Sequence, residues 1–136
     1  ARLHEIGRDI AHNQYHKHGA YILSHADMPG FSRQEQQVMA VLVRAHRRKV
    51  PLAEIQALPE SWHKLLYRMV VVLRLATLLH RSRSESPLPE IKVLVKKKNL
   101  TLIFPTDWLV EHTLTRADLE QETNYLEKTG IALGFE

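Results

Sequence analysis

Apolar residues recur at helical spacing through the first eighty residues of the chain. Leu3, Ile6 and Ile10 lie three or four positions apart, and similar intervals return in the segments that follow. Side chains three and four positions apart share one face of an α-helix, so each segment is predicted to be an amphipathic helix. The expected helices cover residues 3–11, 16–26, 32–45, 52–57 and 62–82.

The third of these helices has the clearest start signal. Ser32 is followed three positions later by Glu35, which is the pattern of a capping box. The serine hydroxyl accepts a hydrogen bond from a free backbone N–H at the helix start, and the glutamate reaches back to the serine N–H. The longest helix, after Pro59, is broadly apolar and is expected to be the central helix of a bundle.

The hydrophobic period changes beyond a stretch rich in Ser and Pro at residues 82–89. This composition is typical of a linker, and we place a domain boundary there, which gives domains 1–86 and 87–136. Apolar residues then alternate with others on both sides of Lys97-Lys98-Asn99, which predicts a β-hairpin. The residues from Trp108 to Thr113 fit either a short strand or a helical turn.

A helix and a strand are expected to complete the second domain. Thr115, with Asp118 three positions later, is interpreted as the cap of a helix that runs to Lys128 and is ended by Gly130 at the C′ position. Residues 131–135 follow as a strand. The predicted fold class is therefore mainly α, a helical bundle followed by a small α+β domain.

Composition narrows the setting of the chain. No apolar run approaches the roughly 18 residues that span a bilayer, and there is no basic and then apolar leader, so a cytoplasmic protein is expected. Without cysteine, only His, Asp and Glu side chains can bind a metal. The chain starts at Ala1 already inside a helical pattern, and we expect it to be part of a longer protein.

Charge is distributed unevenly between the two predicted domains. Residues 1–86 carry thirteen Lys and Arg against seven Asp and Glu, whereas residues 87–136 carry six against eight. The densest cationic run is 44–49. Clustered guanidinium groups bind phosphate oxygens and release counterions from a polyanion, but cations at a helix C-terminus also complement the helix dipole, and both readings stay open. Lys96-Lys97-Lys98 is interpreted as a solvated hairpin tip.

Nine histidines prompt a search for a metal site. Leu3-His4-Glu5-Ile6-Gly7 resembles the His-Asp dyad of HD-type phosphohydrolases, with Glu in place of Asp. Such sites also need an upstream His and a late Asp. At the position of the late Asp, this chain has Thr77. His16 and His18 are two positions apart and are poor partners for one ion. We therefore assign no metal ligand, and interpret His4-Glu5 as a half-buried polar pair in an HD-like fold.

Several ordered motifs resemble the C-terminal region of the bacterial exopolyphosphatase / guanosine pentaphosphate phosphohydrolase family. They include the pentad at residues 3–7 and the segments 15–23, 29–31, 42–47, 73–76 and 104–108. The resemblance implies that catalysis, with Mg²⁺, resides in two N-terminal actin-like domains outside this chain. It also implies an HD-like helical domain and a small α+β domain that hold long polyphosphate and form a homodimer.

The leading hypothesis is a non-catalytic module of such an enzyme that binds polyphosphate or pppGpp and dimerises. No phosphate-binding glycine loop, nucleophile motif or catalytic residue is found, and specific DNA binding is not expected. One rival is a metal-dependent HD-type phosphohydrolase acting on nucleotides. Another is a purely structural oligomerisation domain that uses the apolar surface of residues 62–79. The residues assigned to polyanion contact, by charge, are Arg44, His46, Arg47, Arg48, Lys49, Arg74, Arg81 and Arg83.

Overall fold

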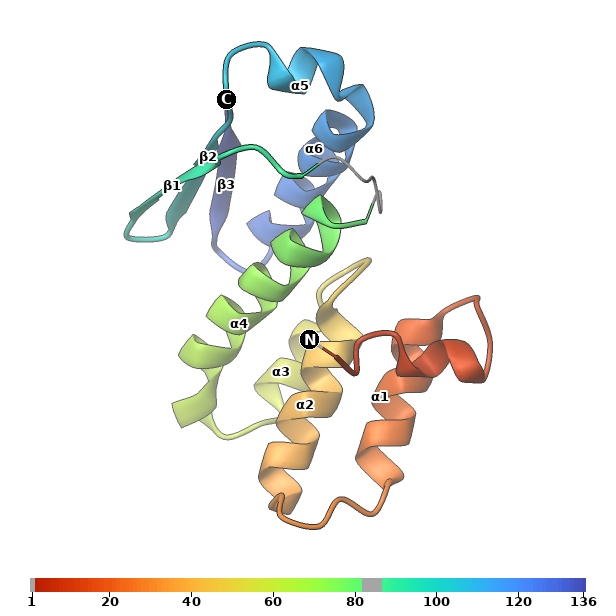
Figure 1. The fold of residues 1–136 in the computed structure, drawn as a ribbon. Coiled ribbons are helices and arrows are strands. Elements are labelled where there is room, and N and C mark those ends of the chain that lie inside the picture. The colour runs from red at the N-terminus through yellow and green to blue at the C-terminus, as the bar shows by residue number, and fades with distance from the viewer. Residues whose placement is uncertain (1, 82–86) are drawn as a thin grey trace. The chain divides into compact units, whose positions relative to one another are not determined.

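The computed structural model describes residues 2–81 and 87–136, and the chain divides into two compact units, Ala1–Arg74 and Leu75–Glu136. The division falls within a long helix, α4 (Glu60–Leu79). The predicted boundary after residue 86 lies at the edge of the described residues and stays a prediction. The predicted fold class is confirmed, because helices dominate the first unit and a small α+β unit follows (Figure 1).

The first unit is built mainly from α1 (Tyr15–His25), α2 (Arg33–Ala45), α3 (Leu52–Gln56) and most of α4. Helices α1 and α2 lie side by side (Figure 1). Two clusters of buried apolar side chains hold the unit together. The first joins α2, α3 and α4, and the second joins α1 and α2. Their buried members are Val38, Ala45, Ile55, Leu58, Leu66 and Val70, and then Leu23, Ala40 and Val43.

The capping box predicted for α2 is confirmed. The Glu35 backbone N–H donates to Ser32 Oγ at 3.2 Å, and the Ser32 backbone N–H donates to the Glu35 carboxylate at 2.7 Å. The Ser32 hydroxyl also donates to the Glu35 carboxylate, at 2.8 Å, and the two hydrogen bonds from Ser32 to this carboxylate lower the pKa of Glu35. Further along α2, the buried Gln36 donates through Nε2 to the carbonyls of Leu23 and Ala26, both at 2.7 Å. The end of α1 is thereby fixed to the start of α2.

The helix predicted over residues 3–11 is wrong. The structure has only a short 3-10 helix there, η1 (Ile6–Asp9), and Ile10 is 55% exposed. The reason lies in tertiary packing at Gly7. A Cβ atom added to Gly7 would overlap the backbone of Tyr15 and Gly19 in α1. The segment therefore runs across α1 with its backbone in direct contact, instead of presenting the side-chain face of a helix.

The second unit contains β1 (Lys92–Lys96), β2 (Asn99–Ile103), α5 (Trp108–Glu111), α6 (Thr113–Glu127) and β3 (Ala132–Phe135). Strands β1 and β2 form the predicted antiparallel hairpin, in which Lys96 pairs with Asn99. Strand β3 adds parallel to β2, so the sheet order is β1-β2-β3. Helix α6 packs against β3 (Figure 1). The open choice at residues 108–113 is settled as a helical turn, α5.

The cap predicted at Thr115 is wrong. Helix α6 begins two residues earlier, at Thr113, and the N-cap His112 makes no side-chain cap hydrogen bond. The Arg116 backbone N–H donates to the His112 carbonyl, which places Thr115 inside the first turn. Gly130 is left-handed, with φ of 76°, and follows the C-cap Lys128 by two residues, one position later than predicted.

Candidate polyanion-binding site

The basic run lies where α2 ends. Arg44 is in the last turn of the helix, Ala45 is its last residue, and His46 is the C-cap. Arg48 has a left-handed backbone with φ of 63°, which turns the chain away from the helix. The run is therefore a tight cationic turn at the negative end of the α2 dipole.

The structure brings the HD-like dyad to this turn. The His4 and His46 rings meet edge to face, with centroids 5.2 Å apart. Glu5 forms an ion pair with Arg8, whose Nη2 lies 2.9 Å from Glu5 Oε1. The same Oε1 lies 3.9 Å from His4 Nε2. The prediction of a half-buried polar pair agrees with this placement, since both side chains are about a third exposed or less. Dyad and basic run thus belong to one cluster.

Tyr15, which the sequence did not single out, is the centre of that cluster. Its ring is 5% exposed. The guanidinium carbons of Arg8 and Arg47 lie 4.8 and 4.7 Å from the ring centroid, within the range of cation–π contacts. The rings of His16 and His46 lie 6.3 and 5.5 Å away. Tyr15 therefore holds two arginines that are 39 positions apart in the sequence.

His16 and His46 are both buried, and burial keeps their rings neutral at pH 7. Burial lowers the pKa of His16 to about 4, with smaller contributions from Arg44, Arg47, His46 and Lys17. His46, at 2% exposed, has its pKa lowered to about 4, again chiefly by burial. Its Nδ1 lies 2.6 Å from the Val43 carbonyl, which can only accept, so Nδ1 carries the proton. Nε2 then accepts from the Tyr15 hydroxyl, 3.5 Å away.

The remaining predicted cations do not all lie at this turn. Arg74 is 2% exposed, and its Nη1 donates to the Ala45 carbonyl at the end of α2, so it anchors α4 to that helix. Arg81 is in the second unit, where it forms an ion pair with Asp118 at 3.3 Å. Arg83 lies outside the described residues. The cations that the turn offers to solvent are Arg44 and Arg47, half-buried, and Arg48 and Lys49, exposed.

A metal site does not form from the residues that the structure describes. Within residues 2–81 and 87–136, no three His, Asp, Glu or Cys side chains are close enough together to hold an ion. The prediction of a metal-dependent HD-type phosphohydrolase therefore has no ligand group in this part of the chain. Nor does any helix there have the length and apolar content needed to cross a bilayer.

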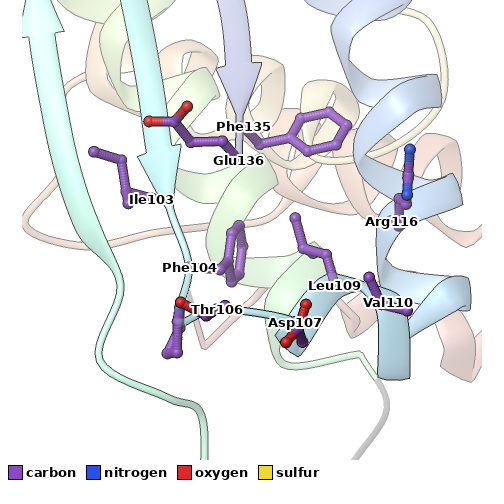
Figure 2. Close-up of a pocket in the computed structure, with 10 residues that line it drawn as sticks. Ile103, Phe104, Thr106, Asp107, Leu109, Val110, Arg116, Phe135 and Glu136 are labelled. Carbon is purple, nitrogen blue, oxygen red and sulfur yellow. The ribbon is translucent and has the colours of Figure 1, made fainter.

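A pocket of about 390 Å³ lies in the second unit (Figure 2). Its walls come from the ends of β2 and β3 and from α5 and α6. Arg116 on one side forms an ion pair with Glu120 at 3.3 Å, and Asp107 has a left-handed backbone with φ of 64°. None of the residues assigned from sequence to polyanion contact lines it, although four of its lining residues belong to the motif at 104–108. The lining residues are Ile103, Phe104, Pro105, Thr106, Asp107, Leu109, Val110, Arg116, Phe135 and Glu136.

The described chain is a mainly helical unit with a cationic turn at the end of α2, followed by a small α+β unit. The chain belongs to the Ppx/GppA phosphatase family: residues 1–123 match the model of Ppx/GppA phosphatase, domain III.

The chain is also similar to several bacterial proteins that share one name. The chain is 38% identical over 133 residues to the guanosine-5'-triphosphate,3'-diphosphate pyrophosphatase of Pseudoalteromonas translucida, a match that covers 98% of this chain. It is 36% identical over 137 residues to the proteins of that name from Vibrio atlanticus and Vibrio cholerae. In each case the matched region is 27% of the relative, so the chain spans about a quarter of their length.

Proposed function

We propose that this chain is the polyanion-binding and dimerising module of a larger hydrolase, which releases terminal phosphate from inorganic polyphosphate or pppGpp. The chemistry, with Mg²⁺, is assigned to actin-like domains outside this chain, and the chain alone is expected to be inactive. The relatives named above are guanosine-5'-triphosphate,3'-diphosphate pyrophosphatases, a name that refers to a polyphosphorylated nucleotide.

The observation that carries this proposal is the unbalanced charge at the end of α2. In the described part of the chain, no carboxylate forms an ion pair with Arg44, Arg47, Arg48 or Lys49. Four cations within six positions repel one another, and a polyanion relieves that repulsion while its counterions are released. His46 is neutral and Arg74 is buried. The proposal therefore assigns phosphate contact at this turn to Arg44, Arg47, Arg48 and Lys49.

Removing two of these cations tests the proposal. Arg47→Ala combined with Arg48→Ala is expected to weaken binding of long polyphosphate by about 100-fold or more, since charge-assisted hydrogen bonds are worth about 1.5–3 kcal/mol each. Filter binding of the chain at several salt concentrations measures the change. The matched control is Lys97→Ala with Lys98→Ala, which removes the same charge from the hairpin tip. Equal losses in the two double variants would show a diffuse charge effect and refute the assignment.

The dimerising part of the proposal is supported by an exposed apolar stripe on α4. Leu65, Met69 and Val72 are 49%, 38% and 68% exposed. Their spacing of four and then three positions places them on one side of the helix, as in a seam between two helices. We assign this stripe to a second copy of the chain, since two copies of the same stripe are complementary in apolar character.

Charges introduced into the stripe are expected to dissociate the dimer. Leu65→Glu with Val72→Glu should weaken self-association at least about tenfold, because burying either carboxylate costs several kcal/mol. Light scattering over a concentration series gives the mass, and circular dichroism checks the fold. Leu114→Glu, at a residue 83% exposed in α6, is the control. A chain that is monomeric before any substitution, or that stays dimeric in the double variant, contradicts this assignment.

A further inference from the structure

We propose that Arg8, Lys17, Arg44 and Arg47, gathered around Tyr15 and His16, form a seat for one terminal phosphate group. We call these six residues the phosphate seat. The inference rests on the proposed polyanion binding. It adds a defined binding place and a preference for the terminal phosphate of a polyphosphate chain. Free orthophosphate carries the same chemistry and serves as the probe.

Two of the guanidinium groups are held in place before any ligand arrives. Arg8 and Arg47 both pack on the Tyr15 ring, and Arg8 is further fixed by Glu5 at 2.9 Å. A guanidinium has five N–H donors in a fixed plane, so one that already packs on an aromatic ring still has donors for phosphate oxygens. Because the side chains are already ordered, binding loses less conformational entropy.

Arg44 and Lys17 add charge to the same place. Lys17 follows His16 in α1, and Arg44 lies in the last turn of α2, three positions before Arg47. All three cations also lower the pKa of His16. The potential at His16 is therefore positive, and it attracts an anion. Among the described residues of this cluster, the Glu5 carboxylate pairs with Arg8 at 2.9 Å. A terminal phosphate group carries about −1.5 to −2 near neutral pH, more than an internal one, and gains correspondingly more from this potential.

His16 supplies an independent indication of a ligand. The residue is 4% exposed, and its Nδ1 has no hydrogen-bond partner among the described residues. An unpartnered buried nitrogen costs about 1–3 kcal/mol, and such atoms in folded proteins call for an explanation. A terminal phosphate fits either form of the ring, since its P–O⁻ accepts from N–H and its P–OH donates to N.

The His16 ring is also the reporter of binding. The charged and titratable groups around it are Tyr15 and Lys17 from α1, Arg44, His46 and Arg47 from the end of α2, and His4, Arg8 and Arg74 beyond them in the cluster. A bound dianion offsets the cations that now disfavour the imidazolium. Occupancy should therefore raise the pKa of His16 from about 4 toward 6.5.

The test is an NMR titration of the 136-residue chain with orthophosphate, following the His16 ring resonances across pH. Saturable shifts at His16, with a raised pKa, are expected. Arg8→Ala and Arg44→Ala should each weaken phosphate binding about tenfold, as the loss of a charge-assisted hydrogen bond requires. Arg8→Lys, which keeps the charge but loses the planar fork, should recover only part of it. Lys64→Ala, which removes an exposed cation of α4 that belongs to neither the basic run nor the seat, is the control.

Three results would overturn the phosphate seat. If orthophosphate leaves the His16 resonances unchanged while long polyphosphate still binds in a salt-sensitive manner, the seat fails and the proposed function stands. If neither ligand binds, both fail. If Lys64→Ala weakens orthophosphate binding as much as Arg8→Ala does, the affinity comes from overall charge and the seat is refuted. At an equal concentration of phosphate groups, long polyphosphate, whose groups are mostly internal, should shift His16 less than orthophosphate does.

Discussion

Replacing Gly7 with alanine is expected to lower the free energy of unfolding by more than about 3 kcal/mol. The added Cβ would overlap the carbonyl of Tyr15 and the backbone nitrogen of Gly19. Backbone atoms of a packed helix cannot rotate away as a side chain can, so α1 must separate from the N-terminal segment. The contact of His4 with His46 and of Arg8 with Tyr15 should be lost with it. Urea denaturation followed by circular dichroism measures the loss.

Gly30→Ala is the matched control for this substitution. Gly30 has φ of 90°, and a Cβ there meets nothing within 4 Å. Its replacement therefore reports only the backbone cost of a left-handed residue, about 1–2 kcal/mol. Gly19→Ala is intermediate, because its Cβ would meet a side-chain atom, Val43 Cγ1, at 2.9 Å. If Gly7→Ala is no less stable than Gly30→Ala, the close approach of the two segments is wrong.

Acid is expected to destabilise the chain between pH 6.5 and 4. His16 and His46 have folded pKa values of about 4, below the 6.5 of an exposed histidine. Between these values the unfolded chain binds protons that the folded chain does not, so stability falls as pH falls and is recovered above pH 6.5. In the folded chain, a proton on one ring also disfavours a proton on the other. We expect the two histidines together to lower the free energy of unfolding by about 3–5 kcal/mol across this interval.

Equilibrium unfolding in urea at half-unit steps of pH measures this loss. Replacing His16 with Gln removes one titrating group, so its slope of stability against pH near pH 5 should be about half that of the original chain. The pKa of Glu35 is lowered from its ordinary value of 4.5, so this carboxylate does not contribute to the loss of stability in the upper part of the interval. A flat profile from pH 6.5 to 5 would contradict the burial of the two rings.

Elements fixed by local pattern were predictable from sequence, and elements fixed by distant contacts were not. The α2 capping box, α4 and the β1–β2 hairpin follow from periodicity and turn residues within a few positions. The segment at residues 3–11 has the same apolar spacing, but backbone contact of Gly7 with α1 decides its conformation. At Thr115 a common Thr-to-Asp spacing was taken for a cap, whereas the His112 carbonyl starts the helix one turn earlier.

The same distinction applies to the candidate site. The charge run located the cationic turn, because charge density is visible in the sequence. Sequence could not show that His46 is buried and neutral or that Arg74 anchors the end of α2, since both depend on packing. Arg8 and Tyr15 were missed because they join Arg47 only in the fold. The glycine that ends the pentad was the available signal, as it marks where two backbones meet.

The central claim is that the turn after α2 binds a polyanion through its cations. The salt dependence of polyphosphate affinity, measured by filter binding on this chain, tests it most directly. Four contacts predict that log K falls with log salt concentration at a slope of about −3, and Arg47→Ala with Arg48→Ala should reduce the slope by about 1.4. No binding at low salt, or an affinity that stays constant between about 50 and 200 mM salt, would contradict it.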